Sequence, residues 1–243
     1  MSGHSHFSSI KHKKAIEDEK RGKIFSKFAR MISVAVKDGV DPASNSKLRQ
    51  VLDEAKDFNM PKDKIERAIK RGTGEIEGGK LEEIVYEAFG PAGIAVIIEC
   101  ITDNRNRTLA EIKHIIQKYN GKLAESGAVK WLFERKGIIS VQIKEDSKDK
   151  ASMELAAIES GADDIYYDEQ EELLEIYTKT EELEKVKKNL TDQKIEIDSS
   201  YLGWIAKDET DVEEKERNAC EKFFEELDEK DDVQNIYSNL KNK

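Results

Sequence analysis

The chain has 243 residues, of which 38% are charged and 37% hydrophobic. This length suits one large domain or two to three small ones, and the composition indicates a soluble, folded protein. No apolar run approaches the roughly 18 to 20 residues that a bilayer crossing needs, and the N-terminus lacks the apolar stretch of a secretory signal. We therefore expect a cytoplasmic protein with no membrane partner.

Charge is distributed unevenly along the chain. Residues 1–71 contain 17 lysines and arginines against 10 acidic residues, a balance of +7, whereas the remainder contains 24 against 41, a balance of −17. A polyanion should be attracted to the first part and repelled by the rest, over a Debye length of about 8 Å in physiological salt. The alternative is that the lysine-rich helices are simply solvated surface.

Helical periodicity dominates the N-terminal region. Apolar residues on one side predict a helix from about residue 23 to 38. Asp41 and Pro42 are interpreted as the cap and first turn of a second helix, and Pro61 as the start of a third that ends before Gly72. The sequence therefore predicts a small N-terminal helical bundle.

Basic residues recur on this predicted bundle at helical spacing. Lys23, Lys27, Arg30 and Lys37 fall on one stripe of the first helix, away from the apolar side. Contacts from such positions to phosphate fix orientation and affinity but carry no sequence information. The predicted nucleic-acid-binding residues are Lys11, His12, Lys13, Lys14, Lys20, Arg21, Lys23, Lys27, Arg30, Arg67, Lys70 and Arg71.

A glycine-rich polar segment, GTGEIEGGK, follows from Gly72 to Lys80. It matches neither the dinucleotide-binding nor the P-loop spacing, and no strand is predicted before it. We interpret it as a linker. The expected organisation starts with a basic helical domain over residues 1–72 and a linker over residues 73–80.

Strand-like patterns begin after the linker. Residues 85–101 predict a hairpin with a turn at Gly90–Gly93. Thr108 and Glu111 resemble a capping box for a helix, and a further strand is predicted over residues 129–133.

From Gly137 the predicted order is strand, helix, strand, strand, helix, strand, which is the split βαβ order of a ferredoxin-like unit. The predicted elements are 138–143, 151–160, 164–167, 173–177, 181–190 and 195–205. An amphipathic helix and a short strand, 233–237, follow. We expect both to return to the first sheet, so that residues 81–134 with 206–243 form domain two and residues 135–205 an inserted domain three. The fold class is α+β.

The loop TDNRNRT contains Asp103, Asn104, Arg105 and Arg107 before a predicted helix. Free backbone amides and two guanidinium groups at such a place favour an anion or a partner. The alternative is that Asp103 and Asn104 cap the helix while both arginines pair with carboxylates. Both interpretations remain open.

Catalytic spacings are not found in the sequence. The acidic run 228–232 is interpreted as solvated surface rather than as paired catalytic carboxylates. Cys100 and Cys220 lack a metal-ligand or disulfide pattern, and the four histidines lack companions that would make a metal site. We expect no enzyme activity, no cofactor and no metal.

Several strings resemble the YebC/PmpR family, which includes the mitochondrial translational activator of cytochrome oxidase. They are GHS with IKH near the N-terminus, NMPKD with IERA at residues 59–68, and YE, GP and TDNRNRT between residues 86 and 108. The resemblance covers essentially the whole chain. It implies a helical domain followed by two α/β domains, the third inserted into the second.

The resemblance also implies regulation of gene expression. Family members are described as DNA-binding transcriptional regulators, and others resemble translation factors acting on ribosomes, including ribosomes stalled at proline-rich stretches. The expected partner is therefore nucleic acid, either DNA or ribosomal or transfer RNA, with the ribosome as a possible assembly and a monomer favoured. One departure is His6-Phe7 in place of the family's Lys-Trp, which removes a fixed charge and a larger stacking surface.

Overall fold

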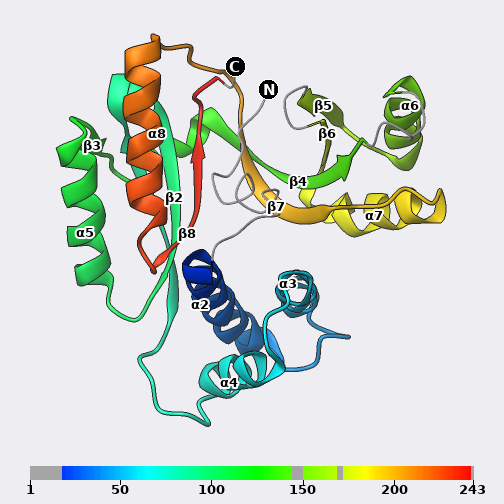
Figure 1. The fold of residues 1–243 in the computed structure, drawn as a ribbon, viewed down its shortest axis with the longest axis horizontal. Helices are drawn as coiled ribbons and strands as arrows, with labels where there is room; N and C mark the ends of the chain where they lie inside the picture. Colours follow the sequence, from blue (N-terminus) through cyan, green and yellow to red (C-terminus); the bar gives the residue numbers. More distant parts are fainter. Residues whose placement is uncertain (1–17, 144–149, 169–171, 242–243) are drawn as a thin grey trace. The chain divides into compact units, whose positions relative to one another are not determined.

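The computed structural model of the protein describes residues 18–143, 150–168 and 172–241. The chain divides into two compact units. One comprises Phe133–Glu209, and the other combines the preceding residues, up to Leu132, with Thr210–Lys241 (Figure 1). None of the described helices combines the length and apolar character needed to cross a bilayer. The N-terminal helices and two antiparallel sheets confirm the predicted α+β class.

The N-terminal helices pack around a core of their own, which we call the helical domain. Ile24, Phe28 and Ile32 of the first helix repeat at helical spacing and are buried against Leu48 and Ala68 of the next two. The elements are α2 (Asp18–Ala35), the short 3-10 turn η1 (Val36–Asp38), α3 (Ser46–Asp57) and α4 (Lys62–Thr73).

The start of α3 differs from the prediction. Asn45 is the N-cap, and its side chain accepts a hydrogen bond from the Leu48 amide at 3.0 Å. Its amide nitrogen also donates to the Ala35 and Gly39 carbonyls, both at 2.7 Å. The predicted cap at Asp41 and Pro42 is therefore wrong. Asn45 hydrogen-bonds a free amide in the first turn of α3 and two carbonyls at the end of the preceding helical segment.

The end of α4 also differs, because Gly72 lies within the helix rather than after it. The helix ends at Thr73, and Gly74 adopts the left-handed conformation with φ of 83°. A β-carbon on Gly72 would lie 2.2 Å from Val36 Cγ2 and 2.4 Å from the Ser33 carbonyl oxygen. The glycine therefore permits close packing of α4 against α2 and η1.

The first sheet is built from segments far apart in sequence. We call residues 81–132 and 210–241, which contain this sheet and its two helices, the first sheet domain. Its strand order is β3-β1-β2-β8, with antiparallel pairing throughout. The elements are β1 (Glu82–Phe89), η2 (Pro91–Gly93), β2 (Ala95–Thr102), α5 (Arg105–Lys118), β3 (Lys122–Leu123), η3 (Lys130–Leu132), α8 (Glu214–Asp228) and β8 (Val233–Ser238). Pairing of β8 with β2 confirms that the C-terminal strand returns to this sheet.

Helices α5 and α8 cover one face of the first sheet (Figure 1). Ile112 of α5 and Phe223 of α8 are fully buried there with Ile98 of β2. The two cysteines, Cys100 and Cys220, are free and buried in the same core. Burial raises the pKa of the Cys220 thiol to about 11 and that of Cys100 further. Both thiols are therefore protonated at neutral pH and unsuited to nucleophilic chemistry.

The strand predicted over residues 129–133 is wrong. Buried Glu87 of β1 accepts hydrogen bonds from the backbone amides of Gly127, Val129 and Lys130, at 2.6, 2.7 and 2.7 Å. Burial by itself raises the pKa of this carboxyl, but the three amides lower it more, and the net shift is downward. Because these amides bind a carboxylate, they are not available to a strand ladder, and the segment turns instead.

The unit Phe133–Glu209 has the predicted split βαβ order. Its strand order, β5-β6-β4-β7, is antiparallel throughout, as a ferredoxin-like sheet requires. Its elements are β4 (Phe133–Gln142), α6 (Lys150–Ser160), β5 (Asp164–Asp168), β6 (Leu173–Thr178), η4 (Thr180–Glu182), α7 (Leu183–Asp192) and β7 (Ser199–Ala206). The last strand starts later than predicted, because the Ile195 amide donates to the Leu190 carbonyl at the end of α7.

Candidate nucleic-acid interface

The predicted nucleic-acid-binding residues separate into three groups in the structure. Lys11, His12, Lys13 and Lys14 lie outside the described residues, as does the side chain of Lys20. A second group is exposed on α2 and α4, and a third is engaged inside the molecule. Only the last two groups have a described geometry, and it differs between them.

The exposed group consists of Arg21 and Lys23 on α2 and Arg67 and Lys70 on α4. The two helices pack directly, since Ser33 Oγ donates to the Ala68 carbonyl at 2.7 Å. Within the described part of the chain, the side chains of Lys23, Arg67 and Lys70 form no ion pair. These cations are available to an external anion.

Lys27 and Arg30 belong to the engaged group. Lys27 is 3% exposed, and its ammonium lies 2.7 Å from Asp228 Oδ1 at the end of α8. The Arg30 guanidinium lies 2.7 Å from Asp232 Oδ1 and donates to the Ile101 carbonyl at 3.1 Å. The predicted basic stripe is therefore not exposed to solvent at these two positions. This side of α2 faces carboxylates of the first sheet domain, which compensate the charges that burial would otherwise penalise.

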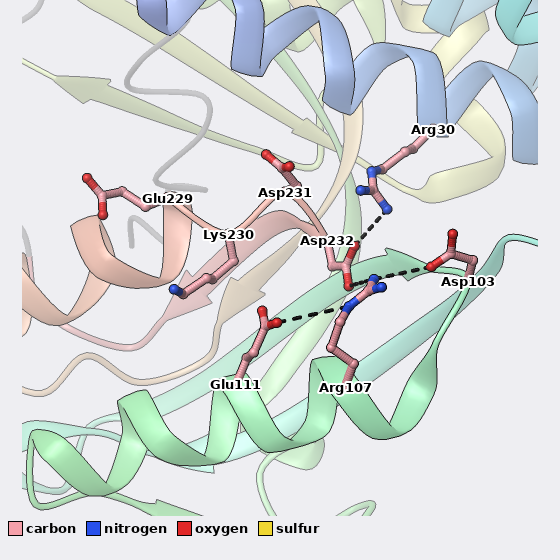
Figure 2. A pocket seen from close by; sticks show the side chains of 8 residues that line it. All are labelled: Arg30, Asp103, Arg107, Glu111, Glu229, Lys230, Asp231 and Asp232. Carbon is pink, nitrogen blue, oxygen red and sulfur yellow. Dashed lines mark hydrogen bonds and ion pairs between the residues drawn. The ribbon is translucent and has the colours of Figure 1, made fainter. Parts of the chain in front are cut away.

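Asp232 is the centre of the engaged group (Figure 2). Besides the Arg30 ion pair, its carboxylate accepts hydrogen bonds from Thr102 Oγ1 at 3.0 Å, Thr108 Oγ1 at 2.6 Å and Arg107 Nη2 at 2.8 Å. Burial alone raises the pKa of Asp232, but the hydrogen bonds from Arg107 and Thr108 and the charge of Arg30 outweigh it, so the net shift is downward. The carboxylate is held ionised.

The loop before α5 contributes to the same cluster. Asn104, rather than the predicted Thr108, is the N-cap and accepts from the Arg107 amide at 3.1 Å. Asp103 pairs with Arg107 at 3.2 Å and with Arg71 of the helical domain at 3.6 Å. The interpretation that Asn104 caps the helix and Arg107 pairs with carboxylates therefore holds. Arg105 is exposed and forms no ion pair among the described residues.

Sequence reasoning missed Asp228 and Asp232, which it assigned to solvated surface. Asp232 is only 4% exposed. The available signal was its position directly before a buried strand, β8, where a solvated carboxylate is not expected. Lys27 and Arg30 lie about 200 positions earlier in the chain and Arg107 lies 125 positions earlier than Asp232, so no local pattern reveals the pairing.

A cleft of about 390 Å³ adjoins Asp232 (Figure 2). Five carboxylates and three cationic side chains line it: Arg30, Asp103, Arg107, Glu111, Glu229, Lys230, Asp231 and Asp232. Arg107 lies 4.0 Å from Glu111, so its charge is shared among several acids. No grouping of side chains suited to a metal ion is found among the described residues. The cleft is a mixed-charge surface on which Arg30 and Arg107 are already paired with carboxylates.

The fold and its charges define a class: an α+β protein in which a basic helical domain joins an acidic body through ion pairs. The sequence profile of the "TACO1/YebC protein N-terminal domain" matches residues 5–75, and that of the "TACO1/YebC second and third domain" matches residues 81–240. The chain therefore belongs to the TACO1/YebC family.

Relatives with similar sequences match this chain over nearly its whole length. A protein from Persephonella marina is 47% identical over 99% of this chain and 96% of its own length, and one from Halothermothrix orenii is 46% identical over 99% and 95%. Both are named probable transcriptional regulatory proteins. The crystal structure of a conserved hypothetical protein from Aquifex aeolicus, 43% identical, superposes with a TM-score of 0.87, covering 98% of this chain and 97% of that one.

Proposed function

We propose that this protein is a non-enzymatic regulator of gene expression that binds nucleic acid, as a DNA-binding transcriptional regulator, through the exposed cations of its helical domain. The observation that carries this proposal is the charge asymmetry: +7 over residues 1–71 against −17 over the rest. Lys23, Arg67 and Lys70 are exposed on that basic part without an ion-pair partner among the described residues. The names of the relatives support the same function.

The chemistry of these side chains favours contact with phosphate rather than with base edges. Lysine and arginine on a helix surface neutralise the nucleic-acid backbone and release its counterions, so binding weakens steeply with salt. The exposed positions on α2 and α4 offer few amide or hydroxyl groups for reading bases. We therefore expect sequence-tolerant binding by this domain.

A second candidate is a ribosome-associated translation factor that contacts ribosomal or transfer RNA. The observation that favours it is the acidic charge of the chain outside the basic domain. RNA repels acidic surface, so only the basic domain would enter an RNA-lined cleft. The inclusion of a translational activator in the family agrees with this alternative.

Binding measured in matched salt separates the two. Affinity for promoter-length DNA and co-sedimentation with intact ribosomes are compared between low and physiological salt. The first proposal predicts that DNA binding persists at physiological salt. If DNA affinity disappears there while ribosome association persists, the protein is a translation factor. If neither is bound at any salt concentration, the helical domain has another role.

A further inference from the structure

Cations of the helical domain are engaged by acceptors of the first sheet domain, and we call this set of interactions the junction. The pairs are Lys27 with Asp228, Arg30 with Asp232 and the Ile101 carbonyl, Lys37 with the Leu81 carbonyl, Lys47 with Glu83, and Arg71 with Asp103. In each pair the helical domain supplies the cation and the sheet domain the anion or carbonyl. We propose that the junction is a phosphate-sensitive clasp, in which nucleic acid competes with Asp228 and Asp232 for Lys27 and Arg30.

The two central pairs have the chemistry of phosphate binding. Each joins a cation to a carboxylate oxygen at 2.7 Å, a short charge-assisted hydrogen bond of the kind that phosphate also forms. Lys27 and Lys23 lie one helical turn apart on α2, so the engaged cation continues the exposed basic surface. This inference rests on the proposed function. The clasp would keep part of the nucleic-acid-binding surface covered until nucleic acid is present.

The apolar part of the junction is small. It consists of Val34, Leu81 and Ile101, with Met31 packed against them. The helical domain and the first sheet domain each have a much larger core of their own. Since the other contacts of the junction are ionic, an external polyanion that competes for these cations weakens the junction without disturbing either core.

The connection between the two domains allows separation. After α4 the chain passes through Gly74, with φ of 83°, and then through Gly78 and Gly79 before β1. These residues lie against the Arg71–Asp103 pair, since a β-carbon on Gly78 would be 3.0 Å from Arg71 Nε and one on Gly79 would be 2.5 Å from Asp103 Cβ. When the Arg71–Asp103 ion pair is broken, this short glycine-rich segment is no longer held against it and serves as a flexible covalent link between the domains.

The test compares Asp228→Asn with Glu83→Gln, each of which removes one negative charge from the sheet-domain side of the junction. Asp228 holds a buried lysine, whereas the Lys47–Glu83 pair is exposed, with side chains 45% and 52% accessible. Affinity for a short DNA duplex is measured across a salt series. If the wild type is open about one tenth of the time, Asp228→Asn raises affinity up to about tenfold. It also steepens the salt slope by about 0.9 for each further phosphate that is neutralised. Glu83→Gln changes the affinity and the salt slope far less.

Hydrogen exchange on the wild-type chain provides a second measurement that needs no variant. Ile101 belongs to the apolar part of the junction, and its carbonyl loses the Arg30 hydrogen bond when the junction opens. Binding of the duplex should therefore expose this position to water and accelerate exchange at the Ile101 amide, while the amides of α5 remain protected. Equal effects of the two variants, or unchanged exchange at Ile101 on a duplex that binds, overturn the clasp. Failure of the wild type and both variants to bind any duplex or ribosome overturns the proposed function instead.

Discussion

Two sets of cations on the helical domain have the same residue types and helical spacing but different surroundings. Lys23, Arg67 and Lys70 are exposed, whereas Lys27 and Arg30 are engaged by carboxylates of the first sheet domain. The difference shows that a basic stripe on a helix is not one functional surface. What lies opposite each turn of the helix decides whether a cation stabilises the fold or is available to a ligand.

The largest expected effect follows from removing the carboxylate at the centre of the engaged set. Asp232→Ala removes the shared acceptor of Thr102, Thr108 and Arg107 within the first sheet domain, as well as the partner of Arg30. Loss of one partner of a buried ion pair costs about 3 to 5 kcal/mol. The unfolding free energy from urea titration should fall by that amount. Asp231→Ala is the matched control, since its side chain is exposed, and a comparable loss there would contradict this role of Asp232.

Acid should reproduce part of this loss. The pKa of Asp232 is lowered in the folded protein by Arg107, Thr108 and Arg30, despite burial. Its contribution to stability is therefore complete above the unfolded pKa of about 3.9 and is lost as pH falls through the lower folded value. The difference in unfolding free energy between wild type and Asp232→Asn should be constant near neutral pH and shrink in this acidic window. A difference that grows on acidification would contradict the assignment.

A smaller effect is expected where helices touch without charge. Gly72→Ala forces a β-carbon against Val36 and the Ser33 carbonyl, and overpacking of this kind costs about 1 to 3 kcal/mol. Gly22→Ala is the matched control, because no atom lies within 4 Å of the added carbon and alanine is the better helix former. Thermal unfolding should therefore shift downward for the first variant and slightly upward for the second.

The smallest effect on stability is expected from the exposed cations. Replacing Lys23, Arg67 and Lys70 with glutamine should change the unfolding free energy by less than about 0.5 kcal/mol for each substitution. The same variant should shallow the salt slope of DNA binding by about 0.9 for each phosphate that is no longer neutralised. Its control replaces Lys185, Lys188 and Lys194, which are exposed in the other compact unit. An equal reduction of affinity in both variants would show that total charge, rather than this surface, controls binding.

Periodicity in the sequence was sufficient for most elements and for the return of the C-terminal strand, because apolar spacing follows from which face each segment buries. It failed where one side chain binds distant backbone. Hydrogen bonds of the Asn45 side chain replace the predicted cap at Asp41. Hydrogen bonds that the Glu87 carboxylate accepts from backbone amides replace the predicted strand over residues 129–133. It also failed at Asp228 and Asp232, whose roles depend on partners that only the folded chain brings near.

The order in which the chain is synthesised gives the last strand a special position. Strand β2 has its neighbour β1 early, but its other edge stays unpaired until β8, close to the C-terminus, has been made. The unit Phe133–Glu209 is contiguous and is made before β8, so it can fold while the first sheet still lacks this strand. Because Asp228 and Asp232 come shortly before β8, Lys27 and Arg30 gain these carboxylate partners only after this part of the chain has been made. A truncated product would therefore expose both a sheet edge and an unpaired set of cations, two features that favour aggregation and non-specific binding.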